Sequence, residues 1–436
     1  MKVAGAKKQT LFLTGINAVV RILGFCMRVW TSRYLGAEIL GVMELAQSVH
    51  MMAIAPFTSG LPVAISRLTA KSRSSHQSEA LAAGLSLVRR FSCFLIPAFL
   101  LFSPAIARLM GDVRVIPSLW FSAPCIVILG YSAAYNGFCY GTDQAALPAI
   151  SELIEQLVRF FLTVLLVRTL SRLTVPWLAA VPTAATMIAE LIGLYYVLWF
   201  AGNRKTKYQP SSAWRSSVYR LAAPATLTRL IQTFFRSATA VMIPNRLQTS
   251  GLSVSEATTQ LGQLNGMVAP VLMLPGIFTS ALSMVTIPRM AKAEEKPGEL
   301  KRLLVLNLCC SVPLAAACAA CVYFLGPVLA NNVFHQPEIL PLFRLSAFQM
   351  ILVPINHVLT STLSALGQQR STLAISLASS LGMLVLVWHL ASLSEFRVYG
   401  VVYAQYASMF ISILLNVLAL LKWRKTAALK LRGKCV

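Results

Sequence analysis

Long apolar stretches separated by short polar segments run through the whole chain of 436 residues. A helix rises 1.5 Å per residue, so about 20 apolar residues cross the roughly 30 Å hydrocarbon core of a bilayer. Stretches of that length give twelve predicted spans. They cover residues 10–32, 40–65, 90–110, 115–140, 147–169, 176–201, 218–245, 260–286, 303–326, 340–365, 372–393 and 398–421. The pattern predicts an all-α polytopic membrane protein with about twelve transmembrane helices.

Composition and charge place this protein in a membrane and give it an orientation. Hydrophobic residues make up 57% of the chain, charged residues 12%, and the mean hydropathy is +0.69, which excludes a soluble protein of this length. Of its 38 basic residues, 25 fall on one side of the predicted spans and seven on the other. Because basic loops stay cytoplasmic, both termini are predicted to be cytoplasmic. The net charge of +24 then attracts anionic membrane lipids, and no nucleic-acid partner is expected.

The cysteines predict neither a disulfide framework nor a metal site. Eight of the nine lie in or beside apolar spans, where cysteine packs as a small hydrophobic residue. Cys318 and Cys321 have the spacing of a metal-binding pair, but no second cluster or nearby histidine completes a site. We expect no metal, and no cofactor, because the sequence also has no phosphate-binding glycine-rich loop.

The sequence indicates two copies of one six-helix unit. The sequence FTSGL at 57–61 returns as FTSAL at 278–282, in the second span of each half. We therefore predict an N-terminal lobe at 1–202, a cytoplasmic linker at 203–217 and a C-terminal lobe at 218–436 with a basic tail. Six spans are an even number, so both copies enter the membrane from the same side, as in parallel transporter repeats.

Four arginines lie inside predicted spans, in pairs that repeat between the halves. Arg21 and Arg28 belong to the first span, and Arg229 and Arg236 to the seventh. Residues seven apart share one helix face. A charge at bilayer depth costs about 3 kcal/mol on insertion scales, so such residues usually face a protein-lined cavity. The guanidinium group matches phosphate oxygens with paired donors, and we predict that these four arginines bind an anionic substrate.

The alternative interpretation is that these arginines pair with buried carboxylates. Glu44 lies on the adjacent span and could reach Arg28, and Glu155 and Arg159 have the i, i+4 spacing at which a helical pair compensates charge. Proline and glycine in the second span suggest a hinge, or packing accommodation. The candidates for cavity or gating roles are Glu44, Glu155, Arg159, Arg67, Pro56 and Gly60. Asparagines are expected to bond between helices, namely Asn265, Asn307, Asn356 and Asn416.

Three segments carry a resemblance to a known family. RILGFCMR at 21–28, SGLPVAISRL at 59–68 and PAISELIEQLVR at 148–159 resemble the stage V sporulation protein B-like branch of polysaccharide biosynthesis flippases. This branch belongs to the multidrug/oligosaccharidyl-lipid/polysaccharide (MOP) exporter superfamily and is related to the MurJ lipid II flippases. The resemblance implies two six-helix lobes like those of MATE transporters, a bacterial plasma membrane, and a role in cell-wall or sporulation chemistry. The MurJ arginines that precede the second-helix glycine are replaced here by Met51 and Met52, which favours an equivalent cargo over lipid II itself.

Three functions follow from these observations. The first is a flippase that moves a polyprenyl-pyrophosphate-linked oligosaccharide or peptidoglycan precursor by alternating access, driven by membrane potential or an ion gradient rather than by ATP. The second is a cation-coupled multidrug exporter of the same fold. The third is a membrane-embedded lipid-sugar polymerase or ligase, which would need an extracytoplasmic catalytic acid or base. The outer loops offer carboxylates but no cluster, so we expect a transporter rather than an enzyme, acting as a monomer.

Overall fold

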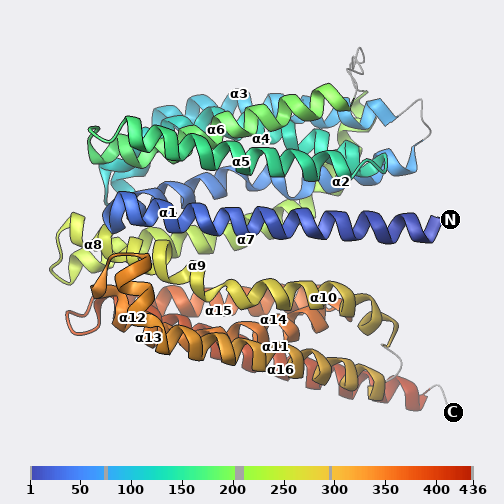
Figure 1. The fold of residues 1–436 in the computed structure, drawn as a ribbon. Coiled ribbons are helices and arrows are strands. Elements are labelled where there is room, and N and C mark those ends of the chain that lie inside the picture. Colours follow the sequence, from blue (N-terminus) through green and yellow to red (C-terminus); the bar gives the residue numbers. More distant parts are fainter. Residues whose placement is uncertain (1, 73–76, 202–210, 294–296, 434–436) are drawn as a thin grey trace. The chain divides into compact units, whose positions relative to one another are not determined.

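The computed structural model describes residues 2–72, 77–201, 211–293 and 297–433, and within these ranges the chain is helical and contains no strand (Figure 1). The first part of the chain forms α1 (Lys2–Thr58), α2 (Gly60–Lys71), α3 (Gln77–Leu109), η1 (Val113–Val115), α4 (Ile116–Gly141), α5 (Ala146–Thr169), α6 (Val175–Phe200) and α7 (Ser212–Thr249). The second part forms α8 (Val254–Leu261), η2 (Gly262–Val268), α9 (Ala269–Leu272), α10 (Leu274–Lys292), α11 (Pro297–Phe324), α12 (Gly326–Val328), η3 (Leu329–Val333), η4 (Pro337–Ile339), α13 (Leu340–Ala347), α14 (Gln349–Ala365), α15 (Gln369–Leu390) and α16 (Arg397–Gly433).

The first two predicted spans are the two arms of α1, which join at Gly36. The backbone of Gly36 has φ 79° and ψ 172°, a region that glycine enters readily because it has no Cβ. The helix is kinked there, and the second arm continues through a turn at Ser59 into α2. A single glycine thus ends one membrane-length helix and starts the next.

The helices have the length and composition of membrane spans. In the part of the chain that the structure describes, seven helices are long and apolar enough to cross a membrane, or up to nine if two bent pairs each form one span. The twelve predicted spans all fall on helices. The number nine is lower than twelve because α1 contains two predicted spans, and because α5 and α7 carry charged and polar residues. The predicted all-α polytopic architecture is confirmed.

The contacts divide the chain into two compact units, Met1–Val241 (unit 1) and Met242–Val436 (unit 2). Most of α7 therefore groups with unit 1. The predicted linker lies mainly at 203–210, outside the described residues, so the predicted lobe boundaries stay a prediction.

Each unit is built around one central helix, and the order of packing repeats. In unit 1, α4 packs against α2, α3 and α6, while α5 packs against α6. In unit 2, α14 packs against α10, α11 and α16, while α15 packs against α16. These are the fourth and the tenth predicted spans, so the central helix has the same position in each copy. Small residues such as Ser122, Ala123 and Gly130 are buried along α4 and let neighbouring helices approach closely.

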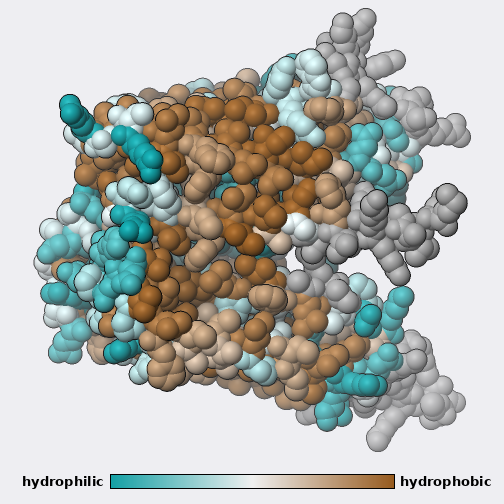
Figure 2. Space-filling view, in the orientation of Figure 1, coloured by the Kyte–Doolittle hydropathy of each residue, from teal (hydrophilic) through white to brown (hydrophobic). Residues whose placement is uncertain are grey.

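The outward faces are apolar, as a lipid-facing surface requires. Phe94, Leu101 and Leu109 of α3 are 81%, 74% and 75% exposed. On the face drawn in Figure 2, hydrophobic residues cover the middle of the helices and hydrophilic residues gather at their ends. Large exposed apolar side chains would be costly in water, and they are the normal condition of a helix in hydrocarbon.

Candidate functional site

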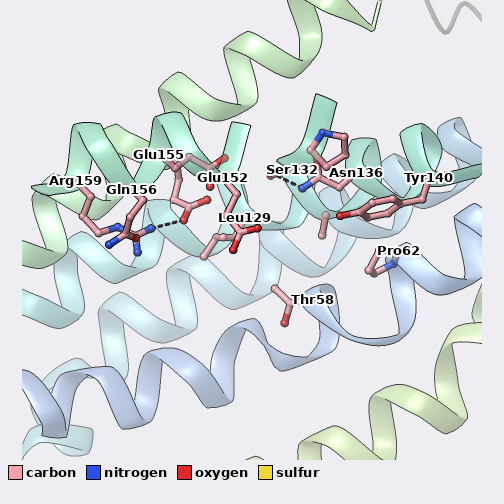
Figure 3. A pocket seen from close by; sticks show the side chains of 13 residues that line it. Thr58, Pro62, Leu129, Ser132, Asn136, Tyr140, Glu152, Glu155, Gln156 and Arg159 are labelled. Atoms are coloured by element: carbon pink, nitrogen blue, oxygen red, sulfur yellow. Dashed lines mark hydrogen bonds and ion pairs between the residues drawn. The ribbon is translucent and has the colours of Figure 1, made fainter. Parts of the chain in front are cut away.

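Unit 1 contains a polar cavity at the level of the predicted spans. It has a volume of about 380 Å³ and is lined by residues of α1, α2, α4, α5 and α6 (Figure 3). Glu152, Glu155 and Arg159 of α5 line it together with Glu190 of α6 and Tyr140 of α4. Two of the predicted cavity candidates, Glu155 and Arg159, thus line the same cavity, and three carboxyl groups face it against one guanidinium.

The buried ion pair of this cavity joins α5 to α6. The guanidinium of Arg159 donates to Glu190 Oε1 at 2.7 Å, and Glu190 is only 6% exposed. Glu155 instead accepts a hydrogen bond from Ser151 Oγ at 2.7 Å. Arg159 therefore pairs directly with Glu190, and its charge reaches Glu155, the predicted i, i+4 partner, only through space. The more deeply buried carboxylate, on the neighbouring helix, takes the guanidinium because it has less access to water.

A glycine on α6 makes room for the Glu155 carboxyl. A Cβ built at Gly193 would lie 2.0 Å from Glu155 Oε1 and 2.4 Å from its Cγ. Any larger residue at this position would push the carboxyl away from the α5–α6 contact. The close approach of α5 and α6 at this level thus depends on the absence of a side chain at Gly193.

Arg28 pairs with Glu44, as predicted from the adjacent span. The Arg28 guanidinium donates to the Glu44 carboxylate, across the two arms of α1. Arg236 of α7 lies near enough for its charge to act on that of Arg28. Charge compensation by Glu44 makes Arg28 the least available of the four predicted anion ligands.

The other three arginines of the predicted set make no hydrogen bond or ion pair with the residues that the structure describes. Arg21, Arg229 and Arg236 are all exposed in unit 1. The α7 segment that carries Arg236 is fixed against α1, because Ser237 Oγ donates to the backbone oxygen of Ser48 at 2.6 Å. This contact places an arginine-bearing segment of the seventh span against the second arm of α1, which also carries Glu44, the partner of Arg28. Their assignment as substrate ligands stays a prediction.

The predicted hinge lies where α1 passes into α2. Pro56 is inside the last turns of α1, and the chain turns at Ser59 before Gly60 starts α2. A Cβ at Gly60 would lie 2.2 Å from the backbone oxygen of Ala222 in α7, so glycine permits a direct helix–helix contact here. Arg67 is exposed further along α2. A gating role for these residues stays a prediction.

Gln156, which lines the cavity, also lies against the arginine-bearing arm of α1. A Cβ at Gly24 would lie 3.4 Å from Gln156 Nε2, and Gly24 lies three residues after Arg21 and four before Arg28, on the same side of the helix. Gln156 is not among the site residues predicted from the sequence. Its position, one residue after Glu155 on a helix with two further charged residues inside a span, is the signal that was available.

Two of the outer carboxylates are engaged in an ion-pair cluster. Arg114 donates to Asp112 Oδ2 at 2.7 Å and to Glu38, and Asp112 also caps η1 by accepting from the backbone nitrogen of Arg114 at 2.9 Å. Asp112 is 3% exposed. A carboxylate held in this way fixes the α3–α4 turn and does not have the freedom expected of a catalytic acid or base.

Sequence comparison identifies the family. The model of the family described as polysaccharide biosynthesis protein matches residues 6–294. The stage V sporulation protein B of Bacillus subtilis strain 168 is 27% identical over 303 residues, covering 66% of this chain and 58% of that protein. The matched region is therefore less than two thirds of this relative's length.

Structural comparison gives the fold. A MATE family multidrug resistance transporter of the MOP superfamily, in an inward-facing conformation, aligns over 94% of this chain and 98% of its own with a TM-score of 0.74 and 15% identity. The lipid II flippase MurJ aligns over 96% of this chain and 90% of its own with a TM-score of 0.76 and 13% identity. These relatives are transporters and flippases rather than enzymes. The helical fold is that of the MOP superfamily, and the extent of the family match means that this chain belongs to the polysaccharide biosynthesis protein family.

Proposed function

We propose that this protein is a flippase for an anionic lipid-linked sugar of the polyprenyl-pyrophosphate class, working by alternating access in the bacterial plasma membrane with both termini cytoplasmic. Arg21, Arg229 and Arg236 bind the phosphates, and Arg28 contributes in competition with Glu44. A flippase must take a charged headgroup out of water while the lipid tail stays in hydrocarbon. Fixed guanidinium groups lower the cost of that transfer.

The observation that carries the proposal is that Arg21, Arg229 and Arg236 lie at predicted membrane depth without a protein partner among the described residues. Each costs about 3 kcal/mol to insert, and none of the described carboxylates pairs with them to offset that cost. A phosphate-bearing ligand supplies the missing charge. The names of two relatives, a sporulation protein and a lipid II flippase, are in keeping with such a cargo.

A cation-coupled exporter is the second candidate, because the cavity of unit 1 is lined by three carboxyl groups. Carboxylates suit cationic drugs or coupling ions, whereas the exposed arginines of α1 and α7 repel them. The two candidates therefore predict opposite substrate charges, and one assay separates them.

The test is reconstitution into liposomes with a fluorescent polyprenyl-pyrophosphate sugar and measurement of its transbilayer movement. We expect Arg21→Ala and Arg229→Ala each to slow movement about tenfold or more, the value of one or two charge-assisted hydrogen bonds. Arg172→Ala, which removes an exposed charge from the α5–α6 turn, is the matched control and should move lipid at the wild-type rate. Unchanged rates in both test variants, or efflux of a cationic dye that depends on Glu155, would reject the flippase.

A further inference from the structure

The cavity of unit 1 contains amide groups whose hydrogen-bonding capacity the protein does not use. Gln156 is 8% exposed and lines the cavity, and its side chain makes no hydrogen bond to the described part of the chain. Asn136 donates to Ser132 Oγ at 3.5 Å, while its Oδ1 is buried and has no partner among the described residues. Buried amides are normally satisfied, so two such groups at one cavity point to a ligand with both donors and acceptors.

The other lining groups define the chemistry of that ligand. Glu152 and Glu155 accept hydrogen bonds when ionised, Tyr140 and Thr58 can donate or accept, and the ring of Tyr140 offers an apolar face. A molecule with several adjacent hydroxyl groups and a partly apolar ring matches this set. A second anion does not, because three carboxyl groups face the cavity against Arg159 alone.

Size and position fit one part of a lipid-linked headgroup. A cavity of about 380 Å³ lies within the range of roughly 300–1,000 Å³ typical of small-molecule sites. Gln156 contacts α1 at Gly24, one helical turn from both Arg21 and Arg28. A pyrophosphate at the arginines therefore places the group attached to it at the mouth of the cavity.

We infer that this cavity is the sugar subsite of the transporter, which holds the first, neutral or amino, sugar of the headgroup and excludes acidic sugars. This inference rests on the proposed flippase function. Gln156, Asn136 and Glu152 bind the sugar hydroxyl or amide groups, and Tyr140 packs against the ring. The arginines recognise the pyrophosphate, and the cavity selects which sugar travels with it.

The experiment compares three fluorescent lipids in the liposome assay: a polyprenyl pyrophosphate with no sugar, one with an N-acetylhexosamine, and one with a hexuronic acid. The readout is the ratio of the transbilayer rates of the sugar-bearing and sugar-free lipids. For the wild type we expect this ratio to be higher with the N-acetylhexosamine than with the hexuronic acid. Gln156→Leu and Asn136→Leu should each lower the N-acetylhexosamine ratio about three- to tenfold, the value of one hydrogen bond to a ligand.

The matched control is Gln260→Leu, which removes a half-buried glutamine amide from α8 in unit 2 and should leave the ratio as in the wild type. Glu152→Gln keeps the hydrogen-bonding shape but removes the charge, and should raise the rate of the hexuronic acid lipid. Equal slowing of all three lipids by the cavity variants, or a change only in the dependence on sodium or pH, would overturn the inference. Arg21→Ala slows every lipid alike if the flippase proposal holds, so the two ideas fail separately.

Discussion

The two units hold their helices together with different buried polar groups. In unit 1, Arg159 of α5 and Glu190 of α6 form a buried ion pair at 2.7 Å. In unit 2, α16, the counterpart of α6, is held to the central helix α14 by neutral groups: Ser412 Oγ and Asn416 Nδ2 donate to Asn356 Oδ1 at 2.8 and 3.0 Å. No carboxylate falls inside a predicted span of the second half.

This difference shows which polar contacts the fold does not require. The two sets of contacts hold the equivalent helices α6 and α16 in place, one with charged groups and one with neutral groups, so neither charge nor neutrality is needed for the architecture. Ionisable groups in hydrocarbon are costly and usually functional, whereas amides and hydroxyls between helices serve as modest adhesive contacts. On the proposed function, the comparison predicts that substitutions in the cavity of unit 1 change transport, while substitutions in the neutral network of unit 2 change stability alone.

The largest effect is expected from breaking the ion pair of unit 1. Arg159→Ala leaves the Glu190 carboxyl, 6% exposed, without the guanidinium. Loss of one member of a buried pair costs about 3 kcal/mol, at the lower end here because the Arg159 side chain is 25% exposed. Thermal unfolding of the purified protein in detergent measures the loss.

The double variant Arg159→Ala with Glu190→Gln is the control for this measurement. It removes the uncompensated charge and should recover much of the lost stability. If Arg159→Ala were no more destabilising than a neutral substitution in the unit 2 network, the distinction between the units would fail.

The positions of the spans and some contacts could be predicted from sequence because they depend on local pattern. Hydropathy placed all twelve spans on helices, and the bond between Arg28 and Glu44 follows from adjacent arms of one hairpin. The expectation that asparagines bond between helices is confirmed for three of them. These are Asn307 with Thr286 at 2.7 Å, and Asn356 with Asn416 at 3.0 Å.

The cavity could not be predicted, because it depends on how separate helices meet. The i, i+4 rule suggested that Arg159 would pair with Glu155, but the structure pairs it with Glu190, 31 residues away. The pairing of Arg159 with Glu190 depends on the depth at which α6 places its carboxylate. The sequence of α5 does not contain this information. The position of Gln156 beside the arginines likewise depends on the approach of α1 at Gly24, which the sequence does not reveal.

A smaller effect is expected from filling the close contact at the hinge of unit 1. Gly60→Ala brings a methyl group against the backbone oxygen of Ala222, where an ideal Cβ would lie at 2.2 Å. A backbone atom cannot rotate away, so we expect a loss of about 1–3 kcal/mol and slower transport in the liposome assay. Gly276→Ala in unit 2 is the matched control, because no atom lies within 4 Å of a Cβ there. Equal tolerance of both substitutions would mean that the α2–α7 contact is not a constraint.

The smallest effect is expected in the neutral network of unit 2. Asn416 is 1% exposed, and Asn416→Ala removes its bond to Asn356. The Asn356 Oδ1 acceptor still receives the Ser412 hydroxyl at 2.8 Å, and Thr360, which loses the longer Asn416 bond of 3.3 Å, is only half-buried. We therefore expect a loss of only about 1 kcal/mol. A double-mutant cycle with Ser412→Ala, followed by thermal unfolding, measures the coupling between the two donors. Because the group is neutral, the transport rate per folded molecule should stay at the wild-type value. A loss of stability as large as that of Arg159→Ala, or a selective loss of transport, would place function in unit 2 as well and remove the contrast between the two units.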